Sequence, residues 1–128
     1  MTNPEIILVL CGIHSLAFVG FHLFFWKLFD WKNEVPKLNR ANRAILRISN
    51  ELLIYLFLFM AVLCFTVPDE LLYSKIGNFL LVGFSIFWLI RTLQQFVYLR
   101  YRHWLVYLLT FFFIFGSILW AWPLMMLG

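Results

Sequence analysis

The sequence predicts an all-α integral membrane protein, an antiparallel up-and-down bundle of four helices with both termini on the non-cytoplasmic side. The composition supports this class first: 64% of the 128 residues are hydrophobic and 12% are charged. An ordinary soluble domain is about half apolar and about a quarter charged, and one of this size could not bury so much apolar surface. We therefore expect a single four-span membrane domain over residues 1–128 with no separate soluble domain.

Four apolar segments have the length of a membrane-spanning helix, which needs roughly 20 mostly apolar residues. They cover about residues 5–26, 45–67, 72–93 and 104–124. The second should stop at Pro68, and Asn39 or Asn42 should cap its start. Pro36 prevents one continuous helix through the first connection. The leader "MTNPE" lacks the positive charge of a signal peptide and no A-x-A-like site follows, so the first segment is expected to remain as an anchor.

The distribution of Lys and Arg predicts the orientation, because cytoplasmic loops of membrane proteins are enriched in these residues. Arg100 and Arg102 lie in the third connection, whereas the middle one has Asp69 and Glu70 against Lys75. The first connection holds Lys27, Lys32, Lys37, Arg40, Arg43 and Arg47. The first and third connections are thus predicted to be cytoplasmic. Basic charge at one membrane face favours anionic lipid as partner, not nucleic acid.

Tryptophan positions agree with this arrangement, because indole rings often lie at membrane interfaces with one wet edge. We expect interfacial positions for Trp26, Trp31, Trp104, Trp120 and Trp122.

Polar side chains from all four segments fall at a similar depth near the cytoplasmic side. His22 lies about 7 Å from Lys27 along the first segment, and Glu51 about 6 Å from Arg47 along the second. Ionisable residues inside a span are costly and usually face the bundle interior, and a Glu51–Arg91 pair would make the second and third segments neighbours. The candidate site comprises His22, Asn50, Glu51, Arg91, Gln94 and Tyr107.

This polar layer has three interpretations. Two interpretations are structural: interhelical contacts that fix the packing, or charged side chains that extend to the headgroups. The functional interpretation is a small pocket open to the cytoplasm or the inner leaflet, able to hold an anionic lipid headgroup or to shuttle a proton.

His14 lies deeper, about 20 Å from Lys27 along the helix and thus at or beyond mid-membrane. At this depth the other segments offer Ser85 and Ser117 as polar partners, and Gly83 and Gly116 would leave room beside the imidazole. A neutral histidine bonded to a serine or a backbone carbonyl is one interpretation, and a cofactor ligand is the other.

No metal site is predicted. His14 and His22 differ by about 12 Å along a straight helix and cannot share one ion. Cys11 and Cys64 lie in apolar runs, where cysteine usually behaves as a small hydrophobe.

Two stretches, "HSLAFVGFHLFFW" and "NELLIYLFLFMAVL", resemble a group of small, uncharacterised bacterial four-helix membrane proteins. Members of that group carry an early histidine in the first span and an Asn-Gln-like pair at the start of the second. The resemblance covers about half of the chain and implies a fold and a location in the bacterial inner membrane, not an activity. His22 stands where that group tends to have an acid. The histidine in the first span is also similar to that of copper-resistance D and HemJ-type proteins, which implies haem, with His14 as axial ligand.

Two classes of function follow. The first is a non-enzymatic structural or accessory protein, or one that binds a lipid or small ligand, with membrane lipid, another membrane protein or a second copy of the chain as partner. The alternative is a membrane-embedded haem-binding or lipid-acting enzyme that uses His14 or His22. Neither a Gly-rich phosphate loop nor a GxSxG motif is present, so no catalytic residue or substrate is predicted.

Overall fold

The computed structural model describes residues 1–100 and 102–128, and every regular element in them is a helix. Four helices are long and apolar enough to cross a membrane: α1 (Asn3–Leu23), α4 (Arg40–Thr66), α6 (Lys75–Tyr98) and α7 (Trp104–Leu127). Short helices occupy the connections: α2 (Phe25–Leu28), α3 (Trp31–Glu34), the 3-10 helix η1 (Val35–Lys37) and α5 (Pro68–Tyr73). The predicted all-α class with four apolar helices is confirmed.

The helix boundaries differ from those predicted where local capping decides them. α1 ends at Leu23 and leaves Trp26 in α2. Pro68 begins α5, and α6 starts only after Ser74, whose hydroxyl accepts a hydrogen bond from the Gly77 amide at 2.9 Å. At the start of α4, the Asn39 side chain accepts from the Asn42 amide at 2.9 Å, so Asn39 is the residue that caps this helix.

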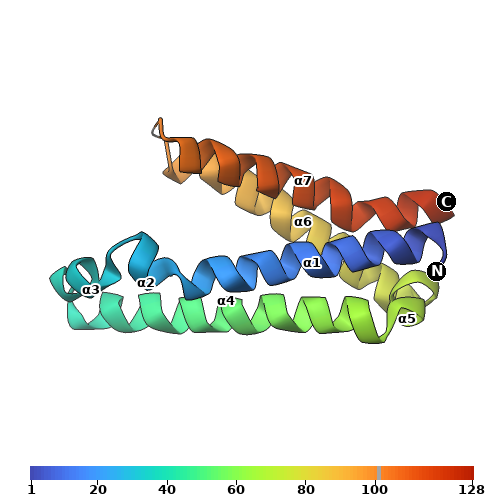
Figure 1. The fold of residues 1–128 in the computed structure, drawn as a ribbon, viewed down its shortest axis with the longest axis horizontal. Coiled ribbons are helices and arrows are strands. Elements are labelled where there is room, and N and C mark those ends of the chain that lie inside the picture. Colours follow the sequence, from blue (N-terminus) through green and yellow to red (C-terminus); the bar gives the residue numbers. More distant parts are fainter. Residues whose placement is uncertain (101) are drawn as a thin grey trace.

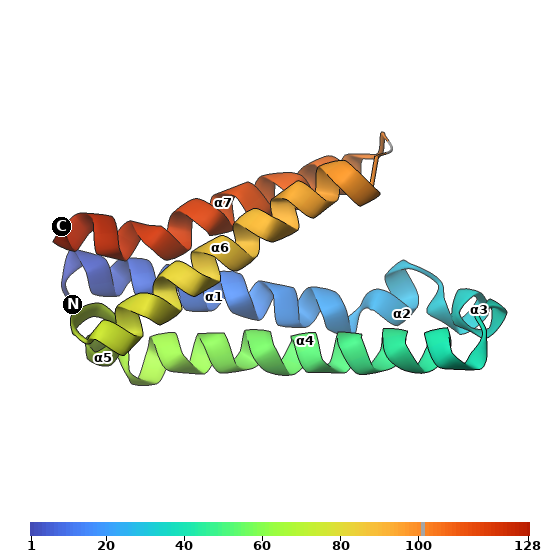
Figure 2. The ribbon, with the colours of Figure 1, turned by 180° about the vertical axis from the view of Figure 1, so that it is seen from behind.

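The long helices form two pairs, α1 with α4 and α6 with α7, and α1 also packs against α7. Figures 1 and 2 show that the α6–α7 pair diverges from the α1–α4 pair toward the end where α2 and α3 lie. The two termini and α5 lie at the opposite end of the molecule (Figure 1). The backbones of α4 and α6 are not closely packed. The two helices meet through their side chains, as where Phe57 stacks on Trp88.

Aromatic rings fill this interior. Trp88 is 1% exposed and lies at its centre. Its ring stacks on Phe57 and on Phe113, with centroid distances of 5.4 Å and 5.9 Å. The Phe18 ring lies 4.6 Å from Trp88, so all four long helices contribute to one aromatic core.

Candidate functional site

A cavity of about 300 Å³ lies beside this aromatic core, within the size range of small-ligand sites. Three of its lining residues are polar or charged: His22 from α1, and Arg91 and Gln94 from α6. The other lining residues are apolar or aromatic: Phe18, Phe21, Phe25, Leu53, Phe57, Phe87, Trp88, Ile90 and Phe113. The cavity therefore combines a small polar wall with an extensive aromatic surface.

His22 is held in one orientation by its own helix. Its Nδ1 lies 2.8 Å from the Phe18 carbonyl oxygen, and because a carbonyl can only accept, Nδ1 must carry a hydrogen. In the neutral imidazole, Nε2 then keeps a lone pair, and it makes no hydrogen bond to the described residues. α1 ends just beyond His22, and the chain turns so that the Phe25 ring lies 4.4 Å from the imidazole. The fixed ring leaves Nε2 able to bind a ligand group.

Arg91 supplies the positive charge of the cavity. Its guanidinium carbon lies 4.5 Å from the centroid of the Phe113 ring, a cation–π contact. The ion pair found within residues 1–100 and 102–128 joins Lys37 to Glu34, so no described carboxylate neutralises Arg91. A cation in apolar surroundings is costly without a counter-charge, and this wall of the cavity therefore favours an anion.

Trp88 adds a further donor that the sequence pattern did not single out. Its Nε1–H is buried and has no acceptor among the described residues. A buried donor without a partner costs about 1–3 kcal/mol.

Gln95, rather than Gln94, is the buried glutamine of α6. Its Nε2 donates to the Val106 carbonyl at 3.3 Å, which ties α6 to α7. The buried face of α6 includes Leu81, Trp88, Thr92 and Gln95, which recur at helical spacing. This helical periodicity was the sequence signal that could have identified Trp88 and Gln95 as buried. Gln94 is exposed and lines the cavity.

The predicted Glu51–Arg91 pair is wrong. Glu51 is exposed and forms no ion pair with the described residues. α4 packs closely on α1 through a buried face that includes Asn50, Phe57 and Ala61. It reaches α6 through the Phe57 ring, which stacks on Trp88. Glu51 follows Asn50 directly, and one residue rotates the side-chain direction by about 100°, so the carboxylate points away from this face.

Asn50 and Tyr107 lie outside the cavity. Asn50 is buried as predicted, and its Nδ2 donates to the His22 carbonyl at 3.3 Å, linking α4 to α1 beside the cavity. Tyr107 is 60% exposed. It lines a separate cleft of about 230 Å³ that also contains Gln95 and Arg102. The polar layer is thus divided between the cavity wall, a helix–helix contact and the surface.

His14 has partners at both ring nitrogens. Nε2 lies 3.1 Å from the Phe112 carbonyl oxygen, and Nδ1 accepts from the Trp120 indole Nε1 at 3.4 Å. This is the predicted neutral histidine bonded to a backbone carbonyl. An axial bond from either nitrogen to haem would require one of these hydrogen bonds to break.

The surroundings of His14 agree only in part with prediction. A Cβ atom on Gly116 would lie 2.6 Å from His14 Cε1, so this glycine does make room for the imidazole. Ser85 donates instead to the Ser117 carbonyl. The prediction that Trp120 lies at the membrane interface is wrong. Its side chain is fully buried, and its indole N–H donates a hydrogen bond to His14.

The two cysteines are both buried. Cys11 donates to the Leu119 carbonyl at 3.4 Å. Within the described part of the chain, no three His, Cys, Asp or Glu residues are grouped as metal ligands.

No protein-family model, curated protein or solved structure matches this chain.

Proposed function

We propose that this chain is a small multi-pass protein of a bacterial inner membrane that binds an anionic amphiphile in the cavity between its helices. The observation that carries the proposal is the Arg91 guanidinium, which has no carboxylate partner among the described residues and lies in the wall of a mainly aromatic cavity. Such a site is suited to a ligand with a negative head and an apolar body.

The polar wall would hold the head group. Arginine binds carboxylate or phosphate through two parallel hydrogen bonds. The Gln94 amide and the His22 imidazole line the same cavity, and His22 can donate through Nε2 when it is protonated. The rings would contact the first part of an acyl or isoprenoid chain. Since the cavity holds only about 300 Å³, the rest of a long chain would extend into the bilayer.

The orientation is part of the proposal. The Lys/Arg-rich segment that contains α2, α3 and η1 lies at the same end of the molecule as the connection between α6 and α7 (Figure 1). By the excess of positive charge in cytoplasmic loops, this end faces the cytoplasm. The four long helices then cross in alternating directions, both termini and α5 lie outside, and the cavity is at the level of the inner leaflet.

The test uses the full chain in a neutral detergent with two probes that share one hydrocarbon chain, oleate and oleyl alcohol. A ligand that binds only the folded state raises the melting temperature. Oleate should stabilise the wild-type protein more than oleyl alcohol does. Arg91→Gln should weaken oleate binding about tenfold or more, the effect of losing one charged hydrogen bond, and should leave the alcohol unaffected.

Arg40→Gln is the matched control, because Arg40 is an exposed cation of α4 that does not line the cavity. This variant should bind oleate as the wild type does. Equal stabilisation by oleate and oleyl alcohol, or an Arg91→Gln protein that still prefers oleate, would contradict the proposal and leave a membrane scaffold as the better description.

A further inference from the structure

A larger basic cleft lies in the Lys/Arg-rich part of the chain. It has a volume of about 580 Å³ and shares no lining residue with the aromatic cavity. Its lining residues are Trp26, Lys32, Val35, Pro36, Arg43, Ala44, Arg47 and Ile48. Three of these side chains are cationic and none is acidic.

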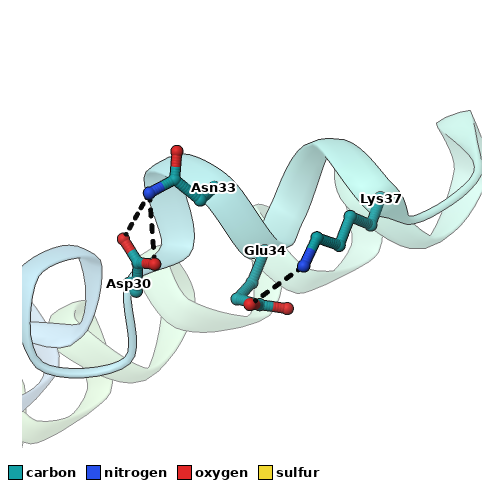
Figure 3. A network of polar contacts seen from close by, with 4 residues as sticks. All are labelled: Asp30, Asn33, Glu34 and Lys37. Carbon is teal, nitrogen blue, oxygen red and sulfur yellow. Dashed lines mark hydrogen bonds and ion pairs between the residues drawn. The ribbon is translucent and has the colours of Figure 1, made fainter.

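The acidic residues of the adjoining segment are already engaged. Figure 3 shows Asp30, whose carboxylate oxygens accept from Asn33 Nδ2 at 2.9 Å and 3.1 Å. Figure 3 also shows Glu34 paired with Lys37 at 3.2 Å. Within residues 1–100 and 102–128, no carboxylate lies at ion-pair distance from the three cleft cations.

Two of the cleft cations belong to α4 and the third to α3. The Arg47 guanidinium lies 4.7 Å from the centroid of the Trp26 ring, which restricts its position. Arg43 precedes it by one helical turn on α4, so the two occupy the same face of the helix. Like charges at this spacing destabilise a helix, and an anion between them would relieve the repulsion. Lys32 belongs to α3 and also lines the cleft.

We propose that this cleft is a phosphate-binding site, selective for a phosphate monoester over a diester. Two guanidinium groups match the geometry of phosphate oxygens, and a third cation matches the second negative charge that a monoester carries near neutral pH. The exposed apolar rim, Trp26 and Ile48, suits a site at the membrane surface. The phosphate can come from a lipid headgroup or from a soluble compound, and the experiment distinguishes these sources.

The experiment measures binding of tail-labelled phosphatidic acid to the full chain in neutral detergent by fluorescence anisotropy. Arg43→Gln and Arg47→Gln should each weaken binding about tenfold, as expected for loss of one charged hydrogen bond. Arg40→Gln removes an equal charge from the same helix but does not line the cleft, and it should change the affinity less than about twofold. Tail-labelled phosphatidylglycerol, a diester, should bind more weakly than phosphatidic acid.

Inorganic phosphate identifies the source. Displacement of phosphatidic acid by millimolar inorganic phosphate supports a soluble phosphate compound as the ligand, and binding that resists it supports a lipid headgroup. The phosphate site is overturned if Arg40→Gln weakens binding as much as Arg47→Gln does, since the attraction is then a diffuse property of the basic surface. Equal affinity for phosphatidic acid and phosphatidylglycerol overturns the monoester selectivity.

Discussion

The Trp120 indole donates a hydrogen bond to the His14 imidazole, with Nε1 3.4 Å from Nδ1, and so ties α7 to α1 inside the bundle. The other imidazole nitrogen of His14 is used by the Phe112 carbonyl. His22, on the same helix, has only Nδ1 engaged by a described residue and borders a cavity. The two histidines of α1 therefore differ in their hydrogen bonds: both ring nitrogens of His14 are engaged, whereas Nε2 of His22 has no described partner.

Alanine substitution should separate these two roles. His14→Ala leaves the buried Trp120 N–H without an acceptor and opens a space in the core, so we expect a loss of about 2–4 kcal/mol of stability. His22→Ala breaks a hydrogen bond to the Phe18 carbonyl of its own helix and leaves no buried N–H unpaired, so it should cost about half as much or less. Thermal unfolding of the full chain in detergent measures both, and an equal loss in the two variants would contradict the distinction.

Glycine substitutions test the contact between α5 and α6. A Cβ atom on Gly77 would lie 2.0 Å from the Glu70 carbonyl oxygen and 2.5 Å from the Leu71 Cα. Because both are backbone atoms that cannot move aside by rotation, Gly77→Ala should cost about 1–3 kcal/mol or more. Gly83 lies in the same helix with nothing within 4 Å of such an atom.

Gly83→Ala is the matched control, and it should be neutral or stabilising by up to about 1 kcal/mol, the gain of alanine over glycine in a helix. Melting temperatures of the two variants, measured side by side in one detergent, provide the comparison. Equal melting temperatures for Gly77→Ala and Gly83→Ala would mean that α5 does not pack on α6 at this point.

Hydropathy and charge predict the number and type of the long helices because the bilayer imposes one length on all of them. Asn39 could be named, with Asn42 as the alternative, because capping depends on neighbouring residues only. The C-terminal end of α1 and the start of α6 could not be placed as accurately. They depend on Ser74 and on the turn at Phe24, which the apolar windows do not reveal.

The depth of a residue was predicted better than the direction in which it points. Asn50 and Glu51 lie at the same level of α4, yet one is buried and the other exposed. Pairing by depth alone joined Arg91 to Glu51, whereas the structure places Arg91 over Phe113. Which face of a helix is buried depends on which helix it packs against, and that was not available from the apolar windows.

Removing the charge of Glu51 or of Arg91 should have different effects on stability, because Glu51 is exposed and Arg91 is half-buried. Glu51→Gln should change stability by less than about 0.5 kcal/mol, as is usual for an exposed side chain. Arg91→Met should raise the melting temperature of the ligand-free protein, because it replaces a half-buried cation that lacks a described counter-charge with an apolar side chain of similar length.

The same Arg91→Met protein should lose the preferential stabilisation by oleate, a trade between stability and binding that is common at functional sites. Both properties are read from melting curves with and without oleate. A large loss of stability in Glu51→Gln would show instead that this carboxylate has an interior partner and is not exposed to the surroundings of the bundle.

The proposed orientation predicts which exposed positions react with a membrane-impermeant thiol reagent. Ala41 is exposed near the start of α4, and Asp69 is exposed in α5 at the other end of the molecule. Both native cysteines, Cys11 and Cys64, are buried, so their background labelling should be low. In intact bacterial cells, Asp69→Cys should be labelled and Ala41→Cys should not, because the positively charged end stays in the cytoplasm. After the membrane is permeabilised, both should react. Labelling of Ala41→Cys in intact cells would reverse the orientation and move the aromatic cavity to the outer leaflet.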